Sequence, residues 1–187
     1  MIAIIAEKPS VGQDIARVIG ATEKKDGYMA GNGYLVTWAL GHLVSLAMPS
    51  AYGYGKASHE DLPMLPEPFQ LVVRQIKTDR GMVTDISAAK QLKVIDEVFS
   101  KCDSIIVATD AGREGELIFR YIYRYLGYTK PFKRLWISSL TDEAIRVGIS
   151  NLKDGEAYDS LYHAADCRAK ADWLVGMNAS RALALAS

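Results

Sequence analysis

The fold is decided by the stretch Ser104-Ile-Ile-Val-Ala-Thr-Asp-Ala-Gly-Arg-Glu-Gly-Glu-Leu-Ile-Phe-Arg120. Its first part, Ile105–Ala108, is a short apolar run of the kind found in a strand that is covered on both faces. A glycine-containing turn that carries Asp110 follows it. Beyond the turn, apolar residues recur at helical spacing, at Leu117, Ile118, Tyr121, Ile122, Tyr125 and Leu126. The stretch therefore predicts a buried strand, a tight turn and a helix in immediate succession.

Acidic side chains gather in this turn, at Asp110, Glu114 and Glu116. The place where a parallel strand ends and a helix begins is where open α/β sheets bind their ligands. Carboxylates repel phosphate, so a role with phosphate would require a divalent cation between the two. The local pattern predicts a Mg²⁺ site.

The start of the chain repeats this arrangement. Met1–Ala6 is a continuous apolar run that ends on Glu7-Lys8-Pro9-Ser10. Ser10 and Gln13 fit a capping box, which predicts that Ser10 caps the helix that follows. Apolar residues line one face of that helix before Gly20 ends it, at Val11, Ile15, Val18 and Ile19. Glu7 and Lys8 are thus expected in a second strand-to-helix turn.

The rest of the pattern predicts an α/β domain with a mainly parallel central sheet over residues 1–153. Asn32-Gly33 indicates a hairpin within Tyr28–Leu43, and Ser45–Pro68 reads as a long ordered loop. Further strands are expected at Phe69–Ile76 and Phe132–Ile137, with Asp79-Arg80-Gly81 as a turn. Helices are expected at Thr84–Cys102 and from Asp142 to about Leu152, the latter capped by Thr141.

Residues 154–187 predict the beginning of a second, helical domain, because a long Ala- and Leu-rich helical pattern starts at Glu156. The pattern stops at Ser187 with no capping residue, from which we expect a truncated piece of a longer protein. The 22 basic and 22 acidic residues cancel, which argues against binding polyanions over the whole surface but permits a local basic groove.

Cys102 and Cys167 lack the paired spacing of a zinc site, and both are expected as buried small apolar residues in a reducing compartment. No leader and no apolar run of membrane length appears, which predicts a cytoplasmic protein without a membrane partner.

If the two strands that precede the acidic turns are neighbours, Glu7, Asp110 and Glu114 converge at the carboxyl edge of the sheet. Mg²⁺ usually takes one or two protein carboxylates and completes its shell with water and substrate phosphate. Lys8 and Arg113 would supply positive charge beside the phosphate. The alternative is that each acid only caps a helix. Two acid-bearing turns, each with an adjacent basic residue, favour the site.

Five motifs together resemble the type IA DNA topoisomerases, most closely their bacterial topoisomerase III group. They follow the order of that family over nearly the whole chain: Glu7-Lys8-Pro9-Ser10, Gly41-His42-Leu43, Asp61-Leu62-Pro63, Thr109-Asp110-Ala111-Gly112-Arg113-Glu114-Gly115-Glu116 and Ala171-Asp172-Trp173-Leu174. The resemblance implies a Toprim domain, which is a Rossmann-like metal-binding fold, followed by the start of a helical DNA-binding domain.

The resemblance also implies roles for individual residues. Glu7 would assist proton transfer at the scissile phosphate, and Lys8 would stabilise that phosphate. Asp110 and Glu114 match the outer acids of an Asp-x-Asp-x-Glu metal motif, and with Glu7 they would hold the metal, Mg²⁺ or alternatively Mn²⁺. Arg113 matches a basic residue beside this motif. The sequence departs from the family at Gly112, where the middle acid is missing; whether Glu116 replaces that acid is left open.

DNA, preferentially single-stranded, is the partner that the resemblance implies. Trp173 and Arg181 match positions where the helical domain meets single-stranded DNA, by base stacking and phosphate contact. Arg168 and Lys8 are further candidates for DNA contact. His42 either lines the DNA groove or is a structural histidine, and the sequence favours neither interpretation.

The family's activity is the ATP-independent relaxation or decatenation of DNA through a transient tyrosine-linked break. In the family that tyrosine lies in a downstream domain, and none of the ten tyrosines here matches its motif. Tyr121, Tyr125 and Tyr162 are expected in the core. We therefore expect a nucleoid-associated topoisomerase fragment that is inactive without the rest of its chain. Two alternatives stay open: a stand-alone Toprim nuclease or nucleotidyl transferase, and a non-catalytic nucleic-acid-binding module.

Overall fold

A computed structural model describes residues 1–187 and is built around one seven-stranded sheet. In spatial order its strands are β11 (Lys153–Asp154), β10 (Phe132–Arg134), β9 (Ser104–Ala108), β1 (Ile2–Ala6), β4 (Tyr34–Trp38), β3 (Tyr28–Gly31) and β2 (Glu23–Lys24). The four strands from β10 to β4 run parallel, and the outer strands pair antiparallel. The predicted mainly parallel α/β sheet is confirmed.

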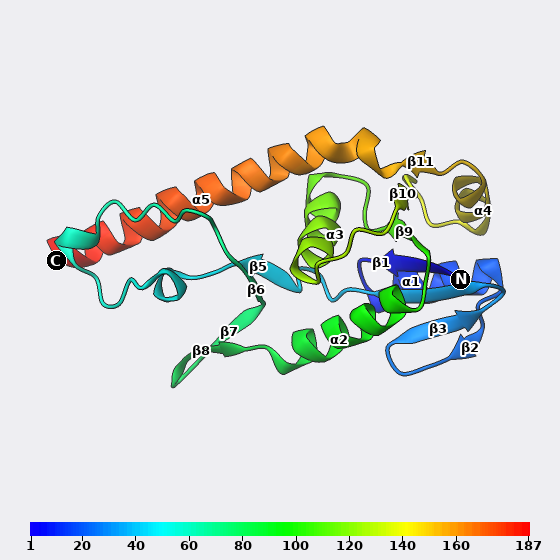
Figure 1. The fold of residues 1–187 in the computed structure, drawn as a ribbon, viewed down its shortest axis with the longest axis horizontal. Helices are drawn as coiled ribbons and strands as arrows, with labels where there is room; N and C mark the ends of the chain where they lie inside the picture. Colours follow the sequence, from blue (N-terminus) through cyan, green and yellow to red (C-terminus); the bar gives the residue numbers. More distant parts are fainter.

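Helices cover both faces of this sheet (Figure 1). They are α1 (Pro9–Ile19), α2 (Ile86–Ser100), α3 (Arg113–Tyr125), α4 (Asp142–Ser150) and α5 (Asp159–Ala186). On one face, α1 and α4 pack over Ile4 and Ile106. On the other, α2 and α3 pack over Ile5 and Ile105. Residues that alternate along β1 and β9 therefore enter two different cores, which explains why both strands are apolar throughout.

The start of α1 corrects one prediction. The helix begins at Pro9 and its N-cap is Lys8, whose side chain makes no capping hydrogen bond, so Ser10 does not cap the helix. Proline suits the first helical position because its φ is already helical and its missing N–H would have no partner there. The predicted stop at Gly20 is confirmed, with φ 86°. Thr141 caps α4 as predicted, by accepting a hydrogen bond from the N–H of Ala144.

The hairpin at Asn32-Gly33 is also confirmed, since both residues have positive φ between β3 and β4. The predicted strand at Phe69–Ile76 is instead split in two at Arg74. β6 (Leu71–Val73) pairs with β5 (Val44–Leu46), whereas β7 (Gln75–Thr78) pairs with β8 (Gly81–Thr84). At the break, Arg74 donates to the carbonyl oxygens of Leu40 and His42, which ties it to a different segment.

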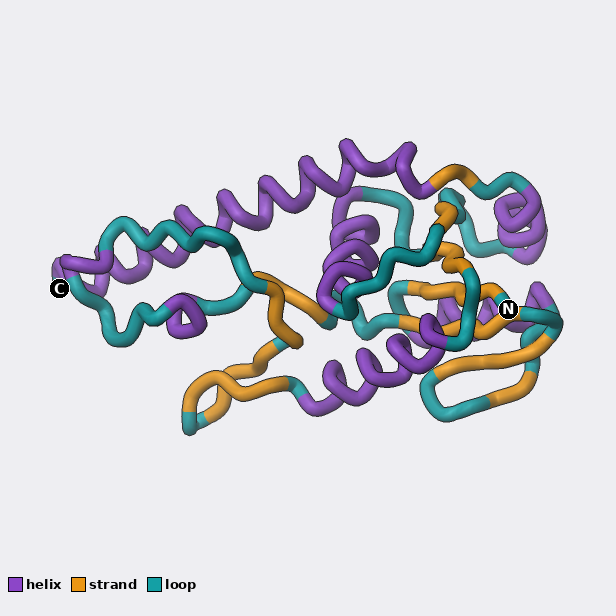
Figure 2. The backbone as a smooth tube through the Cα atoms, in the orientation of Figure 1, coloured by secondary structure: helices purple, strands orange, loops and turns teal.

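The predicted long loop lies between β5 and β6, and contains two short 3₁₀ helices, η1 (Pro49–Tyr52) and η2 (His59–Asp61). Figure 2 shows this loop running beside the far half of α5. Asn178 of α5 fastens the two together, because its side chain exchanges hydrogen bonds with the backbone of Met64. β10 is shorter than the strand predicted at Phe132–Ile137, since its pairing with β9 ends at Arg134, opposite Val107.

The helix α5 follows a short 3₁₀ helix, η3 (Gly155–Tyr158), and spans 28 residues. Tyr162 and Ala165 of α5 enter the same core as α2 and α3. The domain boundary expected between residues 153 and 154 stays a prediction. No helix of the chain is both long enough and apolar enough to span a membrane.

Two burial predictions need correction. Cys102 is buried as expected, but Cys167 is exposed, because the neighbouring residues Ala165 and Asp166 occupy the packed face of α5. Tyr121 and Tyr162 lie in the core, whereas Tyr125, the last residue of α3, is 42% exposed.

Candidate functional site

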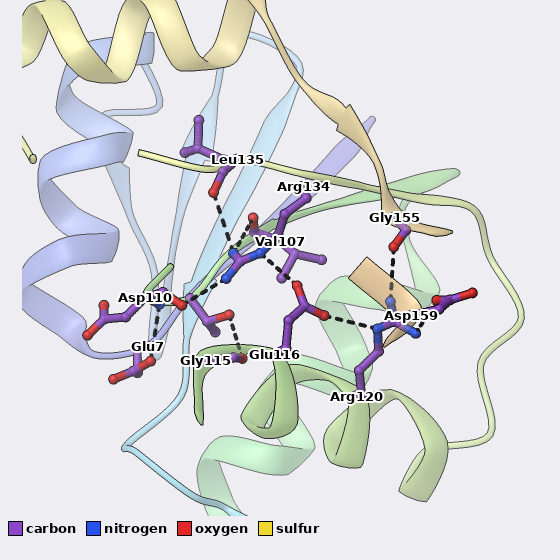
Figure 3. A network of polar contacts seen from close by, with 11 residues as sticks. Glu7, Val107, Asp110, Gly115, Glu116, Arg120, Arg134, Leu135, Gly155 and Asp159 are labelled. Carbon is purple, nitrogen blue, oxygen red and sulfur yellow. Dashed lines mark hydrogen bonds and ion pairs between the residues drawn. The ribbon is translucent and has the colours of Figure 1, made fainter. Parts of the chain in front are cut away.

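The two acidic turns meet at the carboxyl ends of β1 and β9. Ala6 and Ala108 are paired in register, so the chain leaves both strands at the same edge of the sheet. Glu7 follows the first strand, and its Oε1 accepts a hydrogen bond of 3.1 Å from the backbone N–H of Asp110 (Figure 3). The predicted convergence of Glu7 and Asp110 is therefore found in the structure.

Glu7 is half-buried, and burial raises the pKa of its carboxyl above the ordinary value. The negative charge of Asp110 acts in the same direction, while the hydrogen bond from the Asp110 N–H and the nearby His42 oppose it. A carboxyl with a raised pKa holds its proton closer to neutral pH, which is the property that a general acid requires.

Glu7 and Asp110 form no ion pair with any basic side chain. Two adjacent carboxylates without a counter-charge are a donor set that suits a hard divalent cation, which commonly uses one or two protein carboxylates. However, no group of three or more His, Cys, Asp or Glu side chains is placed to hold one metal ion. The predicted set of Glu7, Asp110 and Glu114 is thus only partly assembled.

Glu114, the third predicted ligand, contacts His42 instead. The Nε2 atom of His42 lies 2.8 Å from Oε2 of Glu114, and both side chains are partly exposed to solvent. His42 belongs to the segment that links β4 to β5, so three separate parts of the chain contribute to this edge of the sheet.

Gly112, which replaces the middle acid of the motif, is the N-cap of α3 and has φ 156° and ψ 179°. This region of backbone conformation is essentially restricted to glycine. A side chain built on Gly115, in the first turn of the same helix, would collide with the Asp110 carbonyl. Glycine is thus required at 115, and a side chain at 112 would be strained in this backbone conformation although the space around it is open.

Positive charge at the site comes from Lys8, Arg113 and two helix ends. The side chains of Lys8 and Arg113 are exposed, and neither forms an ion pair. The N-termini of α1 and α3 carry no side-chain cap, so their first N–H groups stay available to an anion. The macrodipoles of both helices favour negative charge at these ends. The site can thus attract a phosphate despite its carboxylates.

Glu116 points away from the other acids, which settles the question that the sequence left open. Its side chain is 1% exposed and lies between two arginines, with Oε1 2.7 Å from Nε of Arg134 and Oε2 3.1 Å from Nε of Arg120. Sequence reasoning missed Arg134 altogether. The available signal was an arginine within the otherwise largely apolar segment Phe132–Ile137.

The fold places His42, Arg168 and Trp173 around one cavity, whereas Arg181 does not line it. Trp173 is 6% exposed, its indole N–H donates to the Ala47 carbonyl, and its ring is enclosed by Tyr52 and Phe69. Trp173 nevertheless lines the cavity between α3 and α5, so its stacking on a DNA base stays a prediction that would require this nearly buried ring to become accessible. Arg181 lies towards the far end of α5, away from the acidic turns (Figure 1).

Arg168 is exposed and lines a cavity of about 510 Å³ between α3, α5 and β5. His42 and Glu114 line the same cavity. It therefore connects Glu114 at the acidic edge of the sheet with the basic side chain of Arg168, and Asp172 and several apolar side chains also line it.

The Toprim domain family matches residues 2–140 of this chain. The chain is 51% identical to DNA topoisomerase 3 of Bacillus licheniformis over 184 residues, which are 96% of the chain and 24% of that protein. It is 51% identical to DNA topoisomerase 3 of Shouchella clausii over 185 residues, which are 97% of the chain and 24% of the relative. The chain thus spans about a quarter of the length of these relatives.

Among solved structures, full-length topoisomerase I from Thermotoga maritima superposes with a TM-score of 0.57. The match covers 92% of this chain and 24% of that structure, at 20% sequence identity. At this identity the likeness supports a shared fold.

Proposed function

Because this chain belongs to the Toprim domain family, we propose that its two acidic turns form the cation- and phosphate-binding half of a type IA DNA topoisomerase active site. The identity of about one half to DNA topoisomerase 3 of two bacteria supports the topoisomerase III group. The observation that carries the proposal is the hydrogen bond between Glu7 and Asp110, which unites the two turns.

We propose Mg²⁺ as the resident cation, with Mn²⁺ as an alternative, since both prefer hard oxygen ligands. Glu7 and Asp110 would hold it, and Glu114 would join them once its contact with His42 is released. A cation bound there would stabilise negative charge on the phosphate. The absence of a third acid at Gly112 leaves more of the shell to water and substrate oxygen.

The other side chains at the carboxyl edge of the sheet would handle the proton and the charge of the phosphate. When it does not hold the cation, Glu7, with its raised pKa, would hold and transfer a proton at the phosphate oxygen. Lys8 and Arg113 would neutralise charge on the phosphate, together with the free N–H groups at the start of α1 and α3.

The proposed substrate is DNA, with the single-stranded form preferred. His42 and Arg168, which line the cavity between α3 and α5, would follow its backbone there, and Lys8 would contact it at the acidic turns. Arg181 would contact it further along α5. The proposed location is the bacterial cytoplasm, at the nucleoid.

The proposal assigns the nucleophile to another part of the parent protein. No tyrosine hydroxyl of these 187 residues forms a hydrogen bond with Glu7, Lys8, Asp110 or Glu114. Cleavage needs a hydroxyl beside its acid or base. The 187-residue chain with Mg²⁺ is therefore expected not to relax supercoiled plasmid, and turnover in that assay would contradict this assignment.

The cation site is tested by titrating the chain with Mg²⁺ in a calorimeter. We expect binding heat for the wild type and none for Asp110→Ala. The control is Asp14→Asn, which removes an exposed carboxylate from α1 without touching the site. Equal heat from wild type and Asp110→Ala would show that the acids do not bind the cation, and would favour a metal-free nucleic-acid-binding module.

A further inference from the structure

A row of alternating charges lies beneath the acidic turn, and all of its members except Asp159 are buried (Figure 3). Arg134 contacts Glu116, Glu116 contacts Arg120, and the NH1 atom of Arg120 lies 2.8 Å from Asp159 at the start of α5. Arg134 and Glu116 are each 1% exposed. The charges of the four side chains cancel, which is the condition under which buried ions are tolerated.

The guanidinium of Arg134 contacts three separate elements at once. Its NH1 donates to the carbonyl of Val107 at the end of β9, at 3.0 Å. Its NH2 donates to the carbonyl of Asp110, at 2.8 Å. Its Nε lies 2.7 Å from Oε1 of Glu116 in the first turn of α3, an ion-pair contact that lacks hydrogen-bond geometry. Because the guanidinium is planar, these three contacts fix the strand end, the turn and the helix relative to one another.

Asp110 is therefore held through both polar atoms of its main chain. Glu7 accepts from its N–H on the β1 side, and Arg134 donates to its C=O on the β10 side. The carboxylate of Asp110 is left exposed and without an ion-pair partner. The surrounding contacts thus fix the backbone from which this carboxylate projects.

Glu116 has a specific part in this arrangement. Burial lowers the pKa of the Arg134 guanidinium, and the carboxylate of Glu116 opposes that effect. Burial likewise raises the pKa of Glu116, against the two arginines. If the pair served only to fill the interior, an apolar pair of similar volume would serve as well or better, since such replacements are often neutral or stabilising.

We infer that Glu116 and Arg134 are positioning residues that hold Asp110 in its ligand-ready orientation. They do not contact the cation or the substrate. The inference rests on the proposed function in one respect, which is that Asp110 binds a divalent cation. The ordering of the turn itself does not depend on that assignment.

The test compares the wild type with two variants of the 187-residue chain. Glu116→Gln keeps the shape of the side chain and removes its charge. The double variant Glu116→Leu/Arg134→Met removes both charges, so it leaves neither partner of this pair as an unpaired ion, and it guards against a failure of Glu116→Gln to fold. Two quantities are measured: hydrogen exchange of the amides of residues 109–116 without metal, and Mn²⁺ affinity by electron paramagnetic resonance.

In both variants the amide hydrogens of residues 109–116 are expected to exchange faster. The affinity for Mn²⁺ is expected to fall about tenfold, which is the smaller end of the loss seen when a residue that supports a metal ligand is mutated. The double variant should do so while its melting temperature stays near that of the wild type. Tyr121→Phe is the matched control, because it removes a buried hydrogen bond to Asp166 from the same helix without touching the turn.

A folded variant with unchanged exchange and unchanged Mn²⁺ affinity would overturn the inference. So would an equal loss in Tyr121→Phe, since it would indicate general destabilisation. If the wild type binds no Mn²⁺, the proposed function fails, and the exchange of residues 109–116 still decides whether Glu116 and Arg134 order the turn.

Discussion

The backbone N–H of Asp110 donates a hydrogen bond to the carboxylate of Glu7, a residue 103 positions earlier in the chain. Neither residue could be brought to the other by local structure. Their meeting depends on β1 and β9 being adjacent, parallel and paired at Ala6 and Ala108. The acid pair is therefore a direct product of the sheet topology, and loss of either strand would remove it.

Glu7→Gln should remove most of the pH dependence of Mn²⁺ binding between the ordinary carboxyl pKa of 4.5 and neutral pH. The pKa of Glu7 is raised by burial, so the wild type loses its carboxylate ligand at a higher pH than an exposed glutamate would. Affinity should rise with pH through that raised pKa in the wild type. In Glu7→Gln the affinity for Mn²⁺ should be lower and should change less with pH. Titrations of Mn²⁺ at several pH values would show this.

The raised pKa of Glu7 also affects the stability of the fold, which should fall as pH rises, whereas the affinity for Mn²⁺ should rise. Because the folded state binds this proton more tightly than the unfolded state, the proton stabilises the fold at low pH, and that contribution is lost as pH rises through the raised pKa. Urea unfolding of Glu7→Gln should therefore show a smaller fall in free energy of unfolding across that window. An unchanged pH profile would mean that the Glu7 pKa is not raised.

Gly112→Asp should not create a third metal ligand, although it completes an Asp-x-Asp-x-Glu pattern in sequence. Gly112 has a backbone conformation that is essentially restricted to glycine, and such strain costs about 1–3 kcal/mol. We expect a loss of that order in the free energy of unfolding and no gain in Mn²⁺ affinity. Gly55→Ala is the control, since Gly55 has open space around it and no positive φ. Tighter Mn²⁺ binding by Gly112→Asp would contradict the backbone argument.

His42→Ala should bind Mn²⁺ somewhat more tightly than the wild type. His42 contacts Glu114 at 2.8 Å, and this contact must break before Glu114 can join the cation. Pairs at partly exposed positions contribute little, so a gain of about two- to fivefold is the expected size. In the His42→Ala background, Glu114→Gln should abolish the gain. If it does not, the effect of His42 does not act through Glu114.

The parts of the site that could be predicted were those that a short stretch of sequence determines. A buried strand followed by an acidic turn is visible at Asp110 and again at Glu7, and the rule that parallel strands end at one edge brings them together. Arg134 could not be found in this way. Its function depends on which carbonyls lie within reach of its guanidinium, and those belong to β9 and to the turn after it.

Trp173 shows a different limit of the sequence, because a residue assigned to a DNA-facing surface is nearly buried in this structure. An aromatic residue on an amphipathic helix can face DNA or its own protein, and helical spacing does not tell which. The deciding contacts come from Ala47, Tyr52 and Phe69, more than 100 positions earlier in the chain. The sequence placed the helix correctly but could not say that the loop before β6 folds over this side chain.

Trp173→Ala should accordingly act on stability. The ring is 6% exposed and its N–H has a backbone partner, so truncation should lower the free energy of unfolding by about 3–5 kcal/mol. Trp173→Phe should lose less, because it keeps the edge-to-face contacts with Tyr52 and Phe69. Val175→Ala, two residues along the same helix and 71% exposed, should stay within about 0.5 kcal/mol of the wild type. Urea unfolding of the three variants measures these differences. A Trp173→Ala chain of unchanged stability that bound single-stranded DNA more weakly would support the stacking role, because the ring would then have to leave its pocket to meet a base.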